Sequence, residues 1–286
     1  MTLNLLQLGR IGYLDGLAIQ RQLVELRHQQ RIGNTLLLLE HPPVLTLGRN
    51  SSRANVLAGD ELLARRGVEI HEINRGGDVT YHGPGQLVGY PIIDLRSFNP
   101  RLGAVDYVRK LEEVLIRTCA SYGVVTERVP QRTGVWTTAG GSIREKKIAA
   151  IGVHISRGIT SHGFALNVTT DLRDFGLIVP CGISDRTVTS LENEIDSAIH
   201  AVPTLEQAGN MVARHFGAVF GHQVLWRESV EDVMGDDLTG DLWREVDQTA
   251  PPDTPRIITQ EMPEDTPLTI PKELKRLRGQ EETVLA

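Results

Sequence analysis

Cys181 is the side chain in this sequence whose surroundings best suit nucleophilic chemistry. It lies in the segment IVPCGI, between a proline and a glycine and just past a predicted strand. A thiol beside a glycine has an open backbone whose amides are free to stabilise an oxyanion. A small buried residue in a turn would have the same surroundings, so this segment alone leaves both roles open. The second cysteine, Cys119, lies on the apolar stripe of a predicted helix and is expected to pack in the core.

A nucleophilic cysteine needs a histidine or a cation close by to become a thiolate. The candidates are His82, His154 and His162, together with Lys147, which opens the predicted strand KIAAIG. Spacing along the chain does not choose among them. Lone histidines are more often structural, and the basic stretch 144–147 is typical of a solvated surface, so these alternatives stay open at this stage.

The densest glycine cluster of the chain is RGGDVTYHGPGQLVGYP, which runs from Arg75 to Pro91. Glycine is used where the backbone turns sharply or approaches another group closely, so this stretch predicts a ligand-lining loop that leads into a strand. It differs from the dinucleotide fingerprint, because no G-x-G-x-x-G opens a helix. It also differs from a P-loop, because no Gly-Lys-Ser/Thr follows.

The elements that must position these residues are indicated by hydrophobic periodicity. Apolar residues at helical spacing, Leu14 and Leu23 among them, predict a helix over 13–31, and a stripe from Val105 to Tyr122 predicts a second helix. A third helix is expected over 204–220, with Thr204 as its N-cap. Strands are expected in the segments TLLLLEH and VLTLGR, which a Pro-Pro turn joins, and over 87–94, 134–138, 147–156 and 162–168. Because strands and helices interleave without a regular βαβ rhythm, the pattern favours an α/β or α+β domain with a mixed sheet flanked by helices.

Composition excludes several classes of function. The 286 residues, 40% apolar, are enough to bury a full core. A net charge of −6 provides no general basic field for nucleic acid or anionic lipid. Two cysteines make a disulfide scaffold or a zinc module improbable, and no apolar run approaches the length that spans a bilayer. We therefore expect a cytoplasmic protein that uses no metal and binds neither nucleic acid nor membrane.

The last part of the chain has a different composition. Six of the 14 prolines fall between Pro251 and Pro271, among mostly charged or polar residues. Such a segment can bury little apolar surface. We expect a catalytic domain over residues 1–248 and a mobile tail over 249–286 that adds little to the core.

Several of these stretches occur together in one order: RGGDVTYHGPGQLVGYPI, GVWT, KIAAIGVHI, HGFALNV and PCGI. In this order they closely resemble the lipoyl(octanoyl) transferases, the B type of lipoate-protein ligase, over residues from about Leu38 to Leu191. The resemblance implies the fold of the biotin and lipoate protein ligases. It also implies transfer of an octanoyl group from the thioester of an acyl carrier protein to one lysine of a lipoyl domain, in 2-oxoacid dehydrogenases or the glycine cleavage H protein. This is the first step of endogenous lipoate synthesis.

The resemblance also assigns roles to residues. Cys181 matches the family's acyl-accepting cysteine, and Lys147 matches the lysine that lowers the pKa of that cysteine. The substrate-binding positions that it implies are Arg75, Gly76, Gly77, Asp78, Val79, Thr80, Tyr81, His82, Ala150, Ile151, Gly152, Gly163, Phe164 and Ala165. The family often has Leu where this chain has Ile151 and Phe164, so contacts there are expected to be mainly with the backbone.

The chemistry implied needs no cofactor, because a thioester donor already carries an activated acyl group and a thiolate can exchange with it. Three alternatives remain on sequence grounds. An ATP-dependent ligase of the same fold would form an acyl-adenylate and need no cysteine. An amidotransferase would pass octanoyl between two lipoyl domains, and a binding module would only recognise such domains. A cationic site at Arg144, Lys146 and Lys147 is expected to meet the acidic carrier protein.

Overall fold

The structure, a computed structural model, describes residues 1–138, 145–179 and 188–235. Cys181, Arg144 and the expected boundary between residues 248 and 249 lie outside the described residues. Within the described ranges, no helix is long and apolar enough to cross a membrane.

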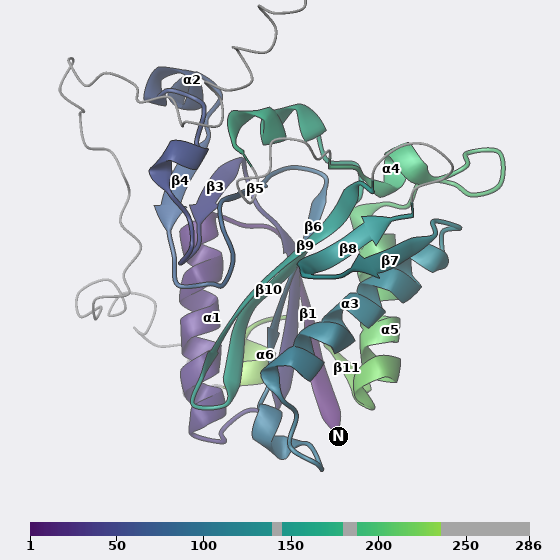
Figure 1. The fold of residues 1–286 in the computed structure, drawn as a ribbon. Helices are drawn as coiled ribbons and strands as arrows, with labels where there is room; N and C mark the ends of the chain where they lie inside the picture. Colours follow the sequence, from purple (N-terminus) through teal and green to yellow (C-terminus); the bar gives the residue numbers. More distant parts are fainter. Residues whose placement is uncertain (139–144, 180–187, 236–286) are drawn as a thin grey trace, which may run out of the picture.

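The fold is organised around a mixed eight-stranded sheet (Figure 1). Its strand order is β11-β1-β2-β6-β10-β9-β8-β7. In that order the strands are β11 (Gln223–Arg227), β1 (Thr2–Arg10), β2 (Asn34–Glu40), β6 (Gln86–Ile92), β10 (Ile159–Asn167), β9 (Lys147–Ser156), β8 (Arg132–Thr137) and β7 (Thr126–Val129). β1 is parallel to both β11 and β2, and every later pair is antiparallel. This mixed sheet confirms the expected fold class.

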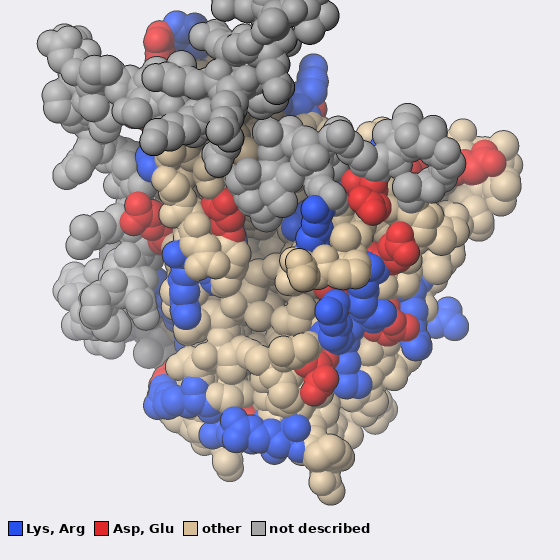
Figure 2. Space-filling model, in the orientation of Figure 1, with Lys and Arg blue, Asp and Glu red and all other residues tan. Residues whose placement is uncertain are grey.

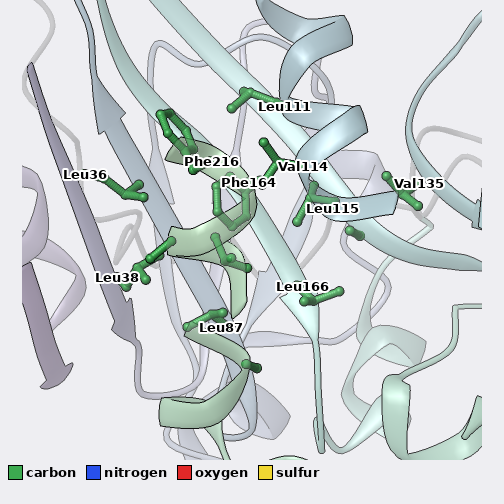
Figure 3. Close-up of a cluster of buried hydrophobic side chains, with 14 of the residues drawn as sticks. Leu36, Leu38, Leu87, Leu111, Val114, Leu115, Val135, Phe164, Leu166 and Phe216 are labelled. Carbon is green, nitrogen blue, oxygen red and sulfur yellow. The ribbon is translucent and has the colours of Figure 1, made fainter. Parts of the chain in front are cut away.

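Helices cover both faces of the sheet. α3 (Ala104–Ala120) and α5 (Leu205–Phe220) pack on one face, and α1 (Tyr13–His28) and the short α6 (Glu231–Met234) pack on the other (Figure 1). The leucines of β2 show why this strand is a continuous apolar run. Leu36 and Leu38 point into the cluster beneath α3 and α5 (Figure 3), whereas Leu37 and Leu39 join the cluster beneath α1. Side chains alternate between the faces of a strand, so a strand covered on both faces needs apolar residues at every position.

A second sheet of three strands lies beside the first. Its order is β4 (Glu69–Glu72), β3 (Val44–Leu47) and β5 (Thr80–His82). The segments TLLLLEH and VLTLGR are therefore strands, as predicted, but the prolines between them carry the chain from the large sheet to the small one. The remaining elements are η1 (Arg53–Asn55), α2 (Asp60–Arg65), η2 (Leu95–Ser97), η3 (Leu172–Leu177) and α4 (Leu191–Glu194).

The helix boundaries agree closely with those predicted from the sequence, but the burial of two side chains differs from the prediction. Thr204 caps α5, its side chain accepting a hydrogen bond from the Gln207 backbone, as predicted. The pattern places Leu14 and Val105 on buried stripes, but they are 41% and 72% exposed. At about 100° per residue, Leu14 lies about 180° from Leu23, and Val105 about 120° from the direction of Leu111. The large buried side chains of these first turns are instead tyrosines, Tyr13 and Tyr107.

Candidate active site

A pocket lies between the small sheet and strands β9 and β10. In Figure 2 the centre of this face is hollowed and mainly uncharged, with both basic and acidic side chains at its margins. From the predicted set the lining residues are Lys147, Arg75, Gly77, Asp78, Val79, Thr80, His82, Ala150, Ile151, Gly152, Gly163, Phe164 and Ala165. Segments far apart in the sequence thus line one space.

Two predicted positions are close to the pocket without lining it. The Gly76 amide donates a 3.0 Å hydrogen bond to the Val153 carbonyl, which ties the loop to β9. Tyr81 is buried, and its hydroxyl donates to Asp174 at 2.9 Å. Both residues support the loop that lines the pocket.

The glycine-rich loop is held against two neighbouring segments. Arg49 and Asn50 donate backbone hydrogen bonds to the carbonyls of Arg75 and Gly77, at 3.0 and 3.2 Å. A β-carbon at Gly152 would lie 2.9 Å from the Gly76 carbonyl oxygen, so only glycine lets β9 approach the loop this closely. Gly152 therefore provides the close approach between β9 and the glycine-rich loop.

The Arg75 guanidinium is buried at one end of the pocket. Its Nη2 donates to the Thr46 carbonyl at 2.7 Å and to the Thr46 hydroxyl at 2.9 Å, and its Nη1 donates to the Gly76 carbonyl at 3.0 Å. These bonds fix a positive charge beside two neutral rings, Tyr13 and His162. An anionic or strongly polar substrate group would be favoured at this end.

A cluster of aromatic and imidazole rings forms the wall next to α1, and sequence reasoning missed its tyrosines. Tyr13 stacks on His71 and His82, with ring centroids 5.3 and 6.4 Å apart, and Tyr90 donates to His41 Nε2 at 2.7 Å. Tyr13 and Tyr90 both line the pocket. Tyr13 comes from a helix whose apolar pattern gives no sign of a site, and Tyr90 comes from the strand that follows the glycine-rich loop, so only the tertiary structure places their rings in the pocket wall.

Burial lowers the pKa of His41 to about 4 and the pKa values of His82 and His162 to about 3. An imidazole in the unfolded chain has a pKa of about 6.5, so as the pH falls the unfolded chain takes up protons first. The stability that these neutral rings contribute is complete above about pH 6.5 and is lost as the pH falls towards the folded values.

We therefore expect the free energy of unfolding to fall on acidification from pH 7 to pH 5, by up to about 1.4 kcal/mol per pH unit for each ring. Urea titrations at pH 7, 6 and 5 measure this slope. His41→Gln removes one of the three rings and should reduce this slope by the contribution of one proton, up to about 1.4 kcal/mol per pH unit. A free energy of unfolding that does not change between pH 7 and 5 would contradict neutral burial of the three rings.

Lys147 lies at the other end of the pocket. Its side chain packs against the neighbouring strand β8. Its Nζ is 5.3 Å from the centre of the Trp136 ring, a cation–π distance. A β-carbon at Gly134 would come within 2.7 Å of Lys147 Cε, so the bare backbone there makes room for the side chain. Gly134 is held in turn by Glu112 of α3, a fully buried carboxylate whose Oε1 accepts from the Gly134 amide at 3.2 Å.

The chain on either side of residues 180–187 is anchored. Val179 donates a backbone hydrogen bond to the Asn55 carbonyl at 2.8 Å, and Val188 pairs with Lys147 in an isolated β-bridge. Val188 also lines the pocket. Lys146, part of the expected cationic site, pairs with Glu194 at 3.0 Å.

The three histidines considered as candidate bases differ in their position relative to the pocket. His82 and His162 line the pocket, whereas His154 is not among its lining residues and contacts the Arg49 guanidinium. Cys119 is fully buried, and burial raises the pKa of its thiol to about 12, which confirms its structural role. Among the described residues, no group of three or more His, Cys, Asp or Glu side chains could hold a metal ion.

Comparison with known proteins identifies the family. Residues 12–217 match the model of the lipoyl protein ligase A/B catalytic domain. The octanoyltransferase of Acidobacterium capsulatum is 74% identical over 239 residues, which cover 82% of this chain and 96% of that protein. The chain belongs to the octanoyltransferases of this family. The octanoyltransferase of Koribacter versatilis is 55% identical over 81% of this chain and 90% of its own length. Members of the octanoyltransferase family are acyltransferases that move an octanoyl group, and this is the reaction class of the chain.

Solved structures confirm the fold. A bipartite lipoate protein ligase from Thermoplasma acidophilum superposes with a TM-score of 0.64 at 16% identity, over 86% of this chain and 92% of that one. Lipoate-protein ligase A bound with ATP gives a TM-score of 0.62, also at 16% identity, over 86% and 94% of the two chains. At this identity the likeness concerns the fold alone.

Proposed function

We propose that the protein transfers octanoyl from the thioester of an acyl carrier protein to a lysine of a lipoyl domain, through a thioester on Cys181 and without ATP. In the first step the Cys181 thiolate attacks the donor carbonyl, a new C–S bond forms, and the bond to the carrier sulfur breaks. In the second step the lysine nitrogen attacks the Cys181 thioester, a C–N bond forms, and the Cys181 thiolate is released.

The observation that carries the proposal is the pocket that has Lys147 at one end and an apolar wall along its length. The wall consists mainly of Ala149, Ala150, Ile151, Phe164 and Ala165. Burying a methylene contributes about 0.8 kcal/mol, so a C8 chain would gain about 5 kcal/mol in such a slot. The pocket therefore suits a thin alkyl chain whose reacting end lies near a cation.

The placement of Lys147 supports its role beside Cys181. Val188, seven residues after Cys181 in the sequence, pairs with Lys147 itself. An ammonium near a thiol favours the thiolate. An amine that loses its proton can then accept one from the incoming lysine in the second step, which a guanidinium does not do at neutral pH.

Two features support the donor and the acceptor. Transfer from a thioester needs no nucleotide, because the acyl group is already activated. The related ligase from T. acidophilum is described together with its E2 lipoyl domain, which supports a lipoyl domain as acceptor for this fold.

Intact-mass analysis tests the proposal. The protein is mixed with octanoyl carrier protein, and separately with octanoate and ATP, and a lipoyl domain is then added to each. We expect one hydroxylamine-labile octanoyl adduct on the peptide containing Cys181, followed by transfer to the lipoyl domain, in the first mixture only. Transfer that requires octanoate and ATP would overturn the proposal in favour of a ligase.

A further inference from the structure

A buried chain of side-chain hydrogen bonds runs from the pocket towards Lys147. His82 Nδ1 lies 2.7 Å from Gln86 Oε1, and Gln86 Nε2 lies 2.9 Å from Asn167 Oδ1. Asn167 Nδ2 is 2.9 Å from the Thr189 carbonyl, and the Thr189 amide donates to the Lys147 carbonyl at 2.9 Å. His82, Gln86, Asn167 and Thr189 are all buried, and Thr189 takes part through its backbone.

Two backbone carbonyls fix the direction of this chain. The Thr189 carbonyl can only accept, so the Asn167 amide must point its NH2 group there and its oxygen towards Gln86. Gln86 Nε2 also faces the Tyr81 carbonyl at 3.2 Å, which again can only accept. Reversing either amide would place carbonyl oxygens against each other, so Gln86 presents its oxygen to His82.

The tautomer of His82 follows from that orientation. An oxygen that faces Nδ1 at 2.7 Å requires a proton on Nδ1, which leaves Nε2 as a lone-pair acceptor. Among the described residues Gln86 is the only group that forms a hydrogen bond with the His82 ring, and His82 lines the pocket. His41 differs, because Ile11 and Tyr90 occupy both of its nitrogens.

We propose that Gln86 and Asn167 are positioning residues that hold His82 as the Nδ1–H tautomer, so that its Nε2 accepts a hydrogen bond from an N–H group of a substrate. The inference rests on the proposed function of the pocket. Two substrate groups have this chemistry: the amine of the acceptor lysine and the amides of the arm that carries the donor thioester. Burial lowers the pKa of His82 to about 3, so the ring stays neutral at pH 7 and orients the donor without taking its proton.

Two substitutions at His82 separate its two nitrogens. His82→Asn keeps a short amide that can reach Gln86 but removes the acceptor at the Nε2 position. His82→Gln places an amide oxygen near the Nε2 position. We expect His82→Asn to slow one half-reaction about tenfold, the loss of one hydrogen bond, and His82→Gln to recover most of that loss. Equal rates in the two variants, or a wild-type rate in His82→Asn, would overturn the proposal.

The half-reactions identify the source of the N–H group. Acylation of Cys181 by octanoyl carrier protein is timed alone, and transfer from acylated enzyme to a lipoyl domain is timed separately. A loss confined to the second step assigns the lysine amine, and a loss confined to the first assigns the donor arm. If the wild-type enzyme is not acylated on Cys181, the proposed function fails, and this result is distinct from any effect at His82.

Nitrogen-15 NMR of histidine-labelled protein reads the tautomer without any substrate. We expect Nδ1 of His82 to be protonated in the wild type, and Gln86→Leu to shift the ring towards the Nε2–H form while slowing the same half-reaction as His82→Asn. Thermal unfolding of each variant verifies that it is folded. A wild-type ring protonated on Nε2 would overturn the proposal whatever the rates.

Discussion

Cys181→Ala is expected to abolish both octanoyl adduct formation and transfer to a lipoyl domain, with a fall in kcat/KM of at least about a thousandfold. The reason is that the acyl group would have no sulfur to reside on between donor and acceptor. The measurement is the rate of octanoyl transfer from carrier protein, together with the intact mass of the enzyme after exposure to the donor.

Cys119→Ala is the matched control. That thiol lies on the buried face of α3 and its pKa is raised to about 12, so it does not ionise at neutral pH. The variant should transfer octanoyl at close to the wild-type rate and lose about 1 kcal/mol of stability from the small cavity. Acylation that persists in Cys181→Ala and disappears in Cys119→Ala would reverse the assignment.

Lys147→Ala is expected to move the midpoint of Cys181 alkylation upward by about one pH unit or more and to slow both half-reactions. A free thiol has a pKa of about 8.5, and a tenfold change in its acidity corresponds to about 1.4 kcal/mol. Lys147→Arg should retain much of the self-acylation, because the charge remains, but lose most of the transfer, because a guanidinium does not release its proton. Iodoacetamide alkylation rates against pH and single-turnover transfer measure the two effects.

Lys146→Ala provides the control for this pair. It removes a cation from the neighbouring position, but one whose Nζ pairs with Glu194. Its alkylation profile should match that of the wild type. An alkylation profile of Lys147→Ala that also matches the wild type would exclude Lys147 from the mechanism.

Much of the fold could be predicted from periodicity. The four consecutive leucines Leu36–Leu39 indicate a strand buried on both faces, and Thr204 indicates where α5 begins. Strand β1 could not be predicted, because the sequence of the N-terminus gives no hint that Leu3 and Leu5 will pair with β2 and β11. Pairing between distant strands depends on tertiary contacts that a local pattern does not contain.

The candidate site could be predicted only unevenly, for a related reason. The loop from Arg75 to His82 and the strand that opens at Lys147 could be found from glycine density and from the family's motifs. Tyr13 and Tyr90 could not, because a tyrosine on an apolar stripe looks like any core residue until the fold turns it towards a pocket. The sequence likewise left His82, His154 and His162 equivalent, and only the distances within the fold distinguish them.

The buried carboxylate of Glu112 makes helix α3 part of the environment of Lys147. Glu112 pairs with Arg109 at 2.7 Å and with Arg128 at 3.2 Å while it holds the Gly134 amide, and Gly134 lies directly under the Lys147 side chain. Removal of this carboxylate, which has almost no exposed surface, would leave the Arg109 guanidinium and the Gly134 amide short of an acceptor. Helix α3 thereby supports the pocket from outside: loss of Glu112 would release the Gly134 backbone against which the Lys147 side chain lies, although Glu112 itself does not line the pocket.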